Sequence, residues 1–166
     1  PICIRQKSGF HYGRGLSTGR NCRIEIFVSG RIEMGERCQI GDNVHLVSSS
    51  LVQIGNDCLF ASKVFVSDTS HGSYGVGGSS PVSRPAERPL DSDPVVIGHR
   101  VWLGENVVVL PGVTIGDGCV VGSGAVVCKS LPENCVAVGV PARPVKVFDE
   151  HAGSWVSIAH ADRKAV

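Results

Sequence analysis

Aliphatic residues recur with a spacing of six along two long parts of the chain. In the later part the repeating positions are Ile97, Leu103, Val109, Ile115, Val121 and Val127. The earlier part shows the same spacing in shorter groups, namely Ile26 and Ile32, Ile40 and Leu46, then Ile54, Phe60 and Val66. The two offsets between these groups each add two residues, which indicates a loosened corner in that part of the repeat.

A period of six is neither the 3.6 residues of an α-helix nor the plain alternation of a flat strand. It fits a short strand followed by a turn, with the glycine that often follows the aliphatic residue relieving strain at the corner. Coils of this kind stack so that each buries the apolar face of its neighbour. A β-sandwich is the alternative, but its turns come about every 8–12 residues. The pattern therefore predicts an all-β stack of coils.

Composition supports many short strands joined by tight turns. The chain of 166 residues contains 21 glycines, 5% aromatic residues and one methionine. Its net charge of +1 argues against a general nucleic-acid binder, which needs a concentrated surplus of Lys and Arg. No apolar run approaches the ~20 residues of a membrane span, and the first residues lack the pattern of a secretory signal. We therefore expect one cytoplasmic domain.

The repeat divides this expected domain, 1–166, into successive parts. A stretch rich in Gly, Ser, Pro and Arg interrupts the repeat, and loops of that length in compact domains are usually functional or disordered. The last nineteen residues, 148–166, are predicted to form either an amphipathic helix or a loose tail with Trp155 as an anchor. The expected parts are an N-terminal cap (1–20), coils (21–70 and 94–136), an active-site loop (71–93) and a C-terminal exit strand and tail (137–166).

Seven cysteines could indicate disulfides, a metal site or core packing. Four of them lie two residues before a repeat residue, at the small inward position where a free cysteine packs as a small hydrophobe: Cys22, Cys38, Cys58 and Cys119. The sequence has no C-x-x-C pair, which weakens the zinc and redox interpretations, so no metal is expected. The roles of Cys3, Cys128 and Cys135 stay open.

His71 differs from the other five histidines because it lies where the repeat stops, in VSDTSHGSYG. By contrast, His45 and His99 fall at outward repeat positions, where surface or interface residues are expected. The ordinary histidine pKa of about 6.5 suits proton transfer near neutral pH. His71 is therefore the histidine for which a functional role is expected.

The segment IGHRVWLGENVVVLPGVTIGDGCVVGSGAVVCKSLPENCVAVGVPARPVK resembles the C-terminal half of hexapeptide-repeat acyltransferases. The resemblance covers roughly residues 24–147 and is greatest to O-acetyltransferases that act on sugars, including polysaccharides. It implies a left-handed parallel β-helix of triangular cross-section with acetyl-CoA as the acetyl donor. It also implies a sugar or polysaccharide acceptor and a homotrimer whose active sites lie between subunits.

The resemblance also implies roles for individual residues. His71 would pass the acceptor's proton on to the coenzyme A thiolate, and Trp102 in the VWLG segment would line the active site. Asp68 would orient the imidazole or hold the acceptor, although a simple turn-forming role is equally compatible. Backbone at Gly72 or Gly104 could approach the oxyanion. The coenzyme A contacts implied are Gly104, Glu105, Ser123, Cys128, Lys129, Arg143 and Lys146.

Two of these positions depart from the family pattern, and other functions remain as alternatives. Cys128 stands where threonine is common, and Glu105 replaces a small polar residue. An N-acetyltransferase acting on an amino sugar is one alternative, and a non-catalytic trimeric scaffold is another. A zinc carbonic anhydrase on the same coils would need two histidines five residues apart, and the sequence has no H-x-x-x-x-H. The acceptor itself is not readable, although Arg84 and Arg88 could meet an anionic sugar.

Overall fold

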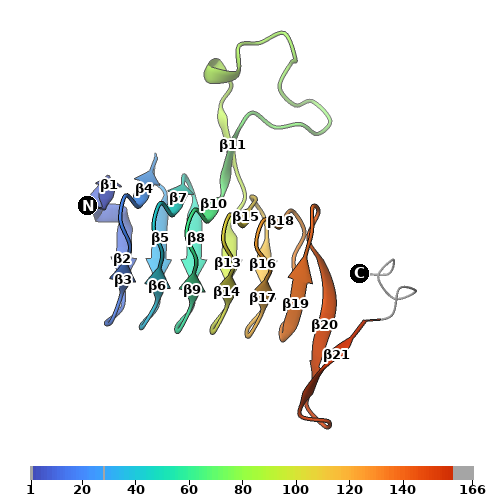
Figure 1. Ribbon diagram of the computed structural model, residues 1–166. Helices are drawn as coiled ribbons and strands as arrows, with labels where there is room; N and C mark the ends of the chain where they lie inside the picture. Colours follow the sequence, from blue (N-terminus) through green and yellow to red (C-terminus); the bar gives the residue numbers. More distant parts are fainter. Residues whose placement is uncertain (1, 28, 159–166) are drawn as a thin grey trace.

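The computed structural model describes residues 2–27 and 29–158, and it shows three parallel sheets lying along one axis (Figure 1). The chain visits the sheets in turn, so that strands adjacent in a sheet belong to successive coils. The first sheet contains β1 (Cys3–Arg5), β4 (Arg23–Ile26), β7 (His45–Ser48), β10 (Phe65–Ser67), β15 (Val108–Val109) and β18 (Val126–Val127). The second contains β2 (Phe10–Tyr12), β5 (Arg31–Met34), β8 (Leu51–Ile54), β13 (Val95–Ile97) and β16 (Thr114–Ile115).

The third sheet closes the triangle and also carries the C-terminal strands. It contains β3 (Ser17–Thr18), β6 (Gln39–Ile40), β9 (Leu59–Phe60), β14 (Trp102–Leu103), β17 (Val120–Val121), β19 (Cys135–Val138), β20 (Arg143–Asp149) and β21 (Ser154–Ser157). Two short 3-10 helices, η1 (Lys7–Gly9) and η2 (Pro85–Glu87), are the helical segments of the described residues. The predicted all-β parallel β-helix is confirmed.

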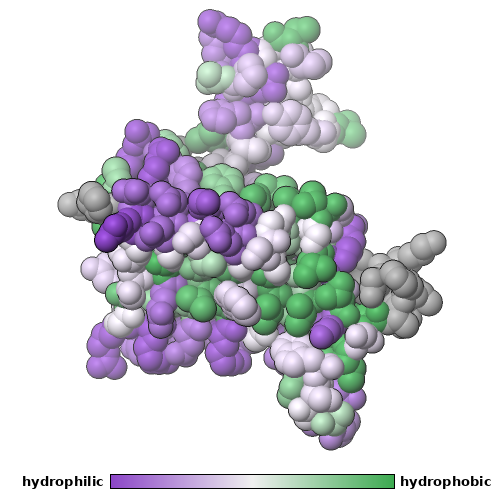
Figure 2. All heavy atoms as spheres, in the orientation of Figure 1, coloured by the Kyte–Doolittle hydropathy of each residue, from purple (hydrophilic) through white to green (hydrophobic). Residues whose placement is uncertain are grey.

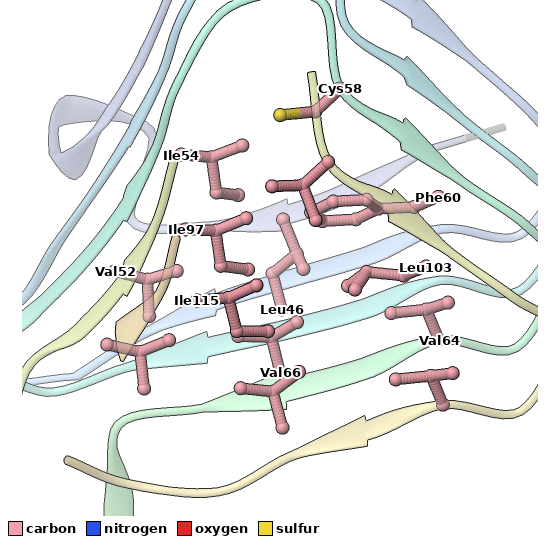
Figure 3. Packing of buried hydrophobic residues seen from close by; sticks show 14 of the residues in the cluster. Leu46, Val52, Ile54, Cys58, Phe60, Val64, Val66, Ile97, Leu103 and Ile115 are labelled. Atoms are coloured by element: carbon pink, nitrogen blue, oxygen red, sulfur yellow. The ribbon is translucent and has the colours of Figure 1, made fainter. Parts of the chain in front are cut away.

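The six-residue period places one aliphatic side chain of each short strand inside the stack. In the first sheet the register aligns Leu46 with Val66, Val66 with Val109, and Val109 with Val127. All four side chains are fully buried and join one continuous core that runs through every coil (Figure 3). β-Branched residues favour this extended, half-buried backbone, so the same pattern sets both the strands and their register.

The glycines at the corners have a different role from the one that the sequence suggests. The left-handed backbone conformation falls two residues after them, at Arg100 (φ 56°) and Asn106 (φ 57°) for example. There it directs the amide along the axis, so that Asn106 N donates to Ser62 O of the preceding coil at 3.1 Å. Gly55 is needed for close approach, because a Cβ there would lie 2.6 Å from the carbonyl oxygen of Gly98. Relief of strain is therefore the wrong explanation for the repeat glycines.

The interruption of the repeat forms an arm that projects from the stack (Figure 1). Its base is an antiparallel ribbon of β11 (Thr69–His71) and β12 (Leu90–Ser92), in which His71 pairs with Leu90. The arm leaves after β10 and returns before β13, at the corner between the first and second sheets. The insertion thus leaves the stack uninterrupted, since β10 still pairs with β15.

The two ends of the chain differ from the sequence-based expectation. Residues expected to form an N-terminal cap form the first coil instead, because β1, β2 and β3 pair in parallel with β4, β5 and β6. At the other end, the expected helix is wrong for residues 148–158. There β20 and β21 form an antiparallel hairpin, with Phe148 and Trp155 in edge contact at 5.4 Å between ring centroids. Residues 159–166 of the predicted tail lie outside the described part.

Five cysteines belong to the hydrophobic core. The four predicted as core residues are buried, as is Cys135, whereas Cys3 and Cys128 are exposed. The sulfur of Cys119 lies 3.6 Å from that of Cys135 on the next coil. Hydrogen bonding to Cys119 together with burial raises the pKa of the Cys135 thiol above its ordinary value.

Candidate active site

His71 stands at the end of β11, where the arm leaves the ribbon. Its side chain is exposed, and its backbone oxygen accepts a hydrogen bond from Tyr74 Oη at 2.6 Å, which holds the turn that follows. Among residues 2–27 and 29–158, no hydrogen bond or ion pair engages the imidazole ring. Both ring nitrogens are thus open to a ligand, as an acid–base group requires.

Asp68 is fully buried and anchors the arm to the preceding coil. Its carboxylate accepts hydrogen bonds from Ser48 Oγ (2.7 Å), Ser49 N (2.8 Å) and Ser50 N (2.9 Å). Its backbone oxygen accepts a hydrogen bond from Asp93 N at 2.9 Å, which closes the base of the arm. None of these bonds reaches His71, so the geometry favours positioning of the arm over direct orientation of the imidazole.

A pocket of about 250 Å³ opens beside His71 on the outer face of the first sheet. Its apolar walls come from Phe27, Val47, Phe65 and Leu90, and its polar atoms come from Ser67, Thr69, Ser70 and His71. Phe27 and Phe65 were not predicted as site residues. Both occupy outward repeat positions, where a side chain usually meets solvent. Aromatic residues at outward positions in a chain this poor in aromatics were the available signal.

The remaining predicted residues lie elsewhere on the stack. Trp102 points outward from β14 in the third sheet and is 50% exposed. Gly104, Glu105 and Ser123 meet at the corner from the third sheet to the first, where a Cβ on Gly104 would lie 2.7 Å from Ser123 N. Lys63 pairs with Glu105 at 3.5 Å, which balances the charge of the unexpected carboxylate.

The predicted cations cluster toward the C-terminal end. Cys128 and Lys129 follow β18, and Arg143 and Lys146 belong to β20. Within the described part of the chain, none of the three cations forms an ion pair. One chain therefore places Asp68 and His71 together at the base of the arm. It places Gly104, Glu105 and Ser123 at the corner from the third sheet to the first. It leaves Trp102 on a different face from His71.

Within residues 2–27 and 29–158, no group of three His, Cys, Asp or Glu side chains is placed to hold a metal ion. None of the helices there has the length and apolar character needed to cross a membrane.

Comparisons with known proteins show which class of protein this parallel β-helix of six-residue repeats belongs to. The family described as "Bacterial transferase hexapeptide (six repeats)" matches residues 94–129. A putative lipopolysaccharide biosynthesis O-acetyl transferase, WbbJ of Escherichia coli, is 45% identical over 157 residues, which cover 93% of this chain and 80% of the relative. Galactoside O-acetyltransferase of E. coli is 34% identical over 140 residues, or 81% of this chain and 64% of the relative.

Solved structures show the same relationship. Galactoside acetyltransferase in complex with coenzyme A superposes with a TM-score of 0.73 at 32% identity, covering 87% of this chain and 68% of that one. The chain belongs to the hexapeptide-repeat acetyltransferases, as its repeat and its VWLG segment predicted.

Proposed function

We propose that the protein transfers an acetyl group from acetyl-CoA to a hydroxyl group of a sugar or polysaccharide, with His71 as the general base. The observation that carries this proposal is the imidazole of His71, which has no hydrogen-bond or ion-pair partner among the described residues and lines a pocket large enough for a small acceptor. Relatives that are O-acetyltransferases, one of galactosides and one in lipopolysaccharide biosynthesis, support a sugar hydroxyl as acceptor.

The acetyl transfer requires one base, and the His71 imidazole can serve as that base. The imidazole accepts the hydroxyl proton as the acceptor oxygen attacks the thioester carbonyl, and a tetrahedral oxyanion forms. Backbone N–H groups are the usual donors to such an oxyanion. When the intermediate collapses, the carbon–sulfur bond breaks and the imidazolium returns its proton to the departing thiolate. The products are the acetyl ester and coenzyme A, and His71 is again neutral.

Coenzyme A would lie along the group of residues that the family resemblance indicates. Lys129, Arg143 and Lys146 have no acidic partner in the described residues, so their charges are available to phosphates. Gly104 and Ser123 offer backbone and hydroxyl groups along the same side as Glu105, whose charge Lys63 offsets.

We further propose that the site is completed between subunits of a homotrimer. In the later coils the outward column of the first sheet continues past the pocket through Val108 and Val126, and that of the third sheet runs through Leu59, Trp102, Val120 and Val136. The second sheet instead presents His11, Glu33, Gln53, Val96 and Thr114. A closed ring pairs two different faces of each subunit, and the two apolar columns offer such a pair. His71 of one copy would then meet Trp102 of the next.

Exposed hydrophobic residues are unevenly distributed along the stack. On the face drawn in Figure 2, hydrophobic residues gather toward the C-terminal half, and hydrophilic residues dominate the N-terminal half. Exposed apolar patches of this kind commonly mark interaction surfaces.

The decisive test is the substitution His71→Ala. Removing the base should lower the turnover of acetyl-CoA with a sugar acceptor by about 10²–10⁴-fold, the usual contribution of general-base catalysis. Circular dichroism and coenzyme A affinity should stay unchanged, because the ring makes no contact that supports the stack. His11→Ala, at an exposed histidine in β2 of the second sheet, serves as the matched control. Full activity in His71→Ala would refute the proposed mechanism, and acetylation of amines alone would refute the proposed acceptor class.

A further inference from the structure

The pocket beside His71 has an unusual balance of hydrogen-bonding groups. Each of its three hydroxyls already donates its hydrogen to a backbone oxygen: Ser67 Oγ to Thr69 O (3.0 Å), Thr69 Oγ1 to Asp91 O (3.1 Å), and Ser70 Oγ to Gly72 O (3.2 Å). Ser67 Oγ also accepts a hydrogen bond from Thr69 N at 3.1 Å. A hydroxyl has one donor and two acceptor sites, so in this arrangement Thr69 and Ser70 each offer a ligand two acceptor sites and Ser67 offers one. Apart from His71, the lining side chains provide no donor.

The positive charges of the arm are also engaged within the arm itself. Arg88 donates from Nε to Ser83 Oγ (3.1 Å), from Nη1 to Tyr74 Oη (3.2 Å) and from Nη2 to Ser83 O (2.8 Å). Arg84 forms an ion pair with Glu87. The two arginines that could have met an anionic sugar therefore stabilise the loop.

The charged groups beside the pocket are paired in the same way. Arg23 Nη2 and His45 Nε2 both contact the Glu25 carboxylate, at 2.8 and 2.9 Å. Burial opposes the charge of Glu25, but these two hydrogen bonds outweigh it and lower the pKa of the carboxyl below its usual range. The guanidinium of Arg5 lies over the Phe27 ring, 5.5 Å from its centroid. Apart from His71, no Asp, Glu, Lys or Arg among the described residues lines the pocket.

The apolar walls of the pocket are held in position by neighbouring side chains. The ring of Phe65 is held by His45, at 5.3 Å between centroids, so this wall is fixed before a ligand arrives. At about 250 Å³ the pocket lies below the roughly 300–1,000 Å³ of sites for drug-sized ligands, and it suits one sugar ring.

We propose that this pocket selects an uncharged sugar ring that lays an apolar face against Phe27 and Phe65. Its hydroxyls donate to Ser67, Thr69 and Ser70. A carboxylate or phosphate in the same place would find acceptors where it needs donors, and burying an anion without donors is costly. The inference rests on the proposed function and narrows its acceptor class to neutral sugars at the subsite next to His71.

The test compares matched acceptors that differ only at C6: p-nitrophenyl galactoside with the galacturonide, and the glucoside with the glucuronide. We expect the neutral member of each pair to bind at least about tenfold more tightly, as measured by Kd, because a uronide also lacks the C6 hydroxyl that could accept the acetyl group and turnover would mix the two effects. Phe65→Ser should raise KM for the neutral sugar about tenfold and leave KM for acetyl-CoA unchanged. Tyr12→Ser, an exposed aromatic on the second sheet, is the matched control. Leu90→Arg adds a cation at the rim and should narrow the preference against the uronides.

Binding of the same glycosides to His71→Ala, followed by ligand-observed NMR, separates the two levels of the argument. A neutral glycoside that binds this variant but is never acetylated by the wild type would overturn the proposed function and leave the selection intact. Equal or tighter binding of the uronides, or no effect of Phe65→Ser on KM, would overturn the selection alone.

Discussion

A single buried carboxylate holds the arm of this protein to its coils. Asp68 accepts three hydrogen bonds from Ser48, Ser49 and Ser50 and has no access to solvent. The sequence marked Asp68 only through its distance of three residues from His71, which could not show its partners. Ser48–Ser50 lie eighteen to twenty residues earlier in the chain, and they become neighbours because the coils stack. Proximity to His71 therefore identified the residue, and only the stacking identifies its contacts.

Asp68→Ala should destabilise the fold by about 2–4 kcal/mol, because it leaves the buried amides of Ser49 and Ser50 without an acceptor. The arm should also become more sensitive to proteolysis, since its base loses its connection to the preceding coil. Urea denaturation and limited proteolysis measure the two effects. Asp91→Ala, an exposed change in β12, should alter stability by no more than about 0.5 kcal/mol. Equal stability of the two variants would contradict the anchoring role.

At the scale of the elements, many corners combine a glycine needed for close approach with a residue in the left-handed conformation two positions later. At one corner these are Gly55 and Asp57, and at the next coil Gly98 and Arg100. Asp57 and Arg37 on successive coils also join through two hydrogen bonds, of 2.6 and 2.9 Å. The corners thus connect coil to coil as regularly as the strands do.

Gly55→Ala tests the spatial role of the corner glycine. The added methyl group would lie 2.6 Å from the carbonyl oxygen of Gly98, so two coils must separate, at a cost of about 1–3 kcal/mol. Thermal unfolding measures the loss. Gly75→Ala in the arm, where the added carbon meets nothing within 4 Å, is the control and should unfold like the wild type. A neutral Gly55→Ala would show that the corners tolerate more expansion than the structure indicates.

The six-residue repeat predicted the coil strands because each short strand carries its own inward aliphatic residue. It could not predict β20 and β21, which form no coil and pair antiparallel at the end of the third sheet. It also could not predict the β11–β12 ribbon, whose strands are separated by eighteen residues without repeat character. In both hairpins the strands pair across an intervening segment that carries no six-residue repeat, so the repeat gives no sign of the pairing. Likewise, Phe27 and Phe65 become pocket walls only where the arm base adds Leu90 and His71 to the sheet.

At the scale of the whole molecule, one chain presents the candidate groups on separate faces. His71 follows the first sheet, and Trp102 projects from the third. Sequence resemblance assigned both to one site without showing that a single chain keeps them apart. Two unlike apolar faces on each copy are what a closed ring of subunits requires.

Mixed trimers test whether the site is shared. His71→Ala and Trp102→Ala should each be nearly inactive alone. Co-expressed in equal amounts, they should recover about a quarter of wild-type activity, because random assembly pairs an intact His71 with an intact Trp102 at that frequency across a ring interface. Mixing separately purified trimers without subunit exchange is the control. No recovery in verified mixed trimers would place both residues in the same subunit's site.

The regular stacking also fixes the distance between two sites on the surface by the number of coils that separate them. Each coil advances about 4.8 Å along the axis, the spacing of neighbouring strands. Two such steps, from β10 to β15 and from β15 to β18, separate the departure of the arm from the residues before Lys129. Distance along the surface is therefore counted in whole coils. Evolution or design could lengthen or shorten that reach by adding or removing one whole coil, which is eighteen residues from Val109 to Val127. A change of one residue within a strand would instead turn inward side chains outward.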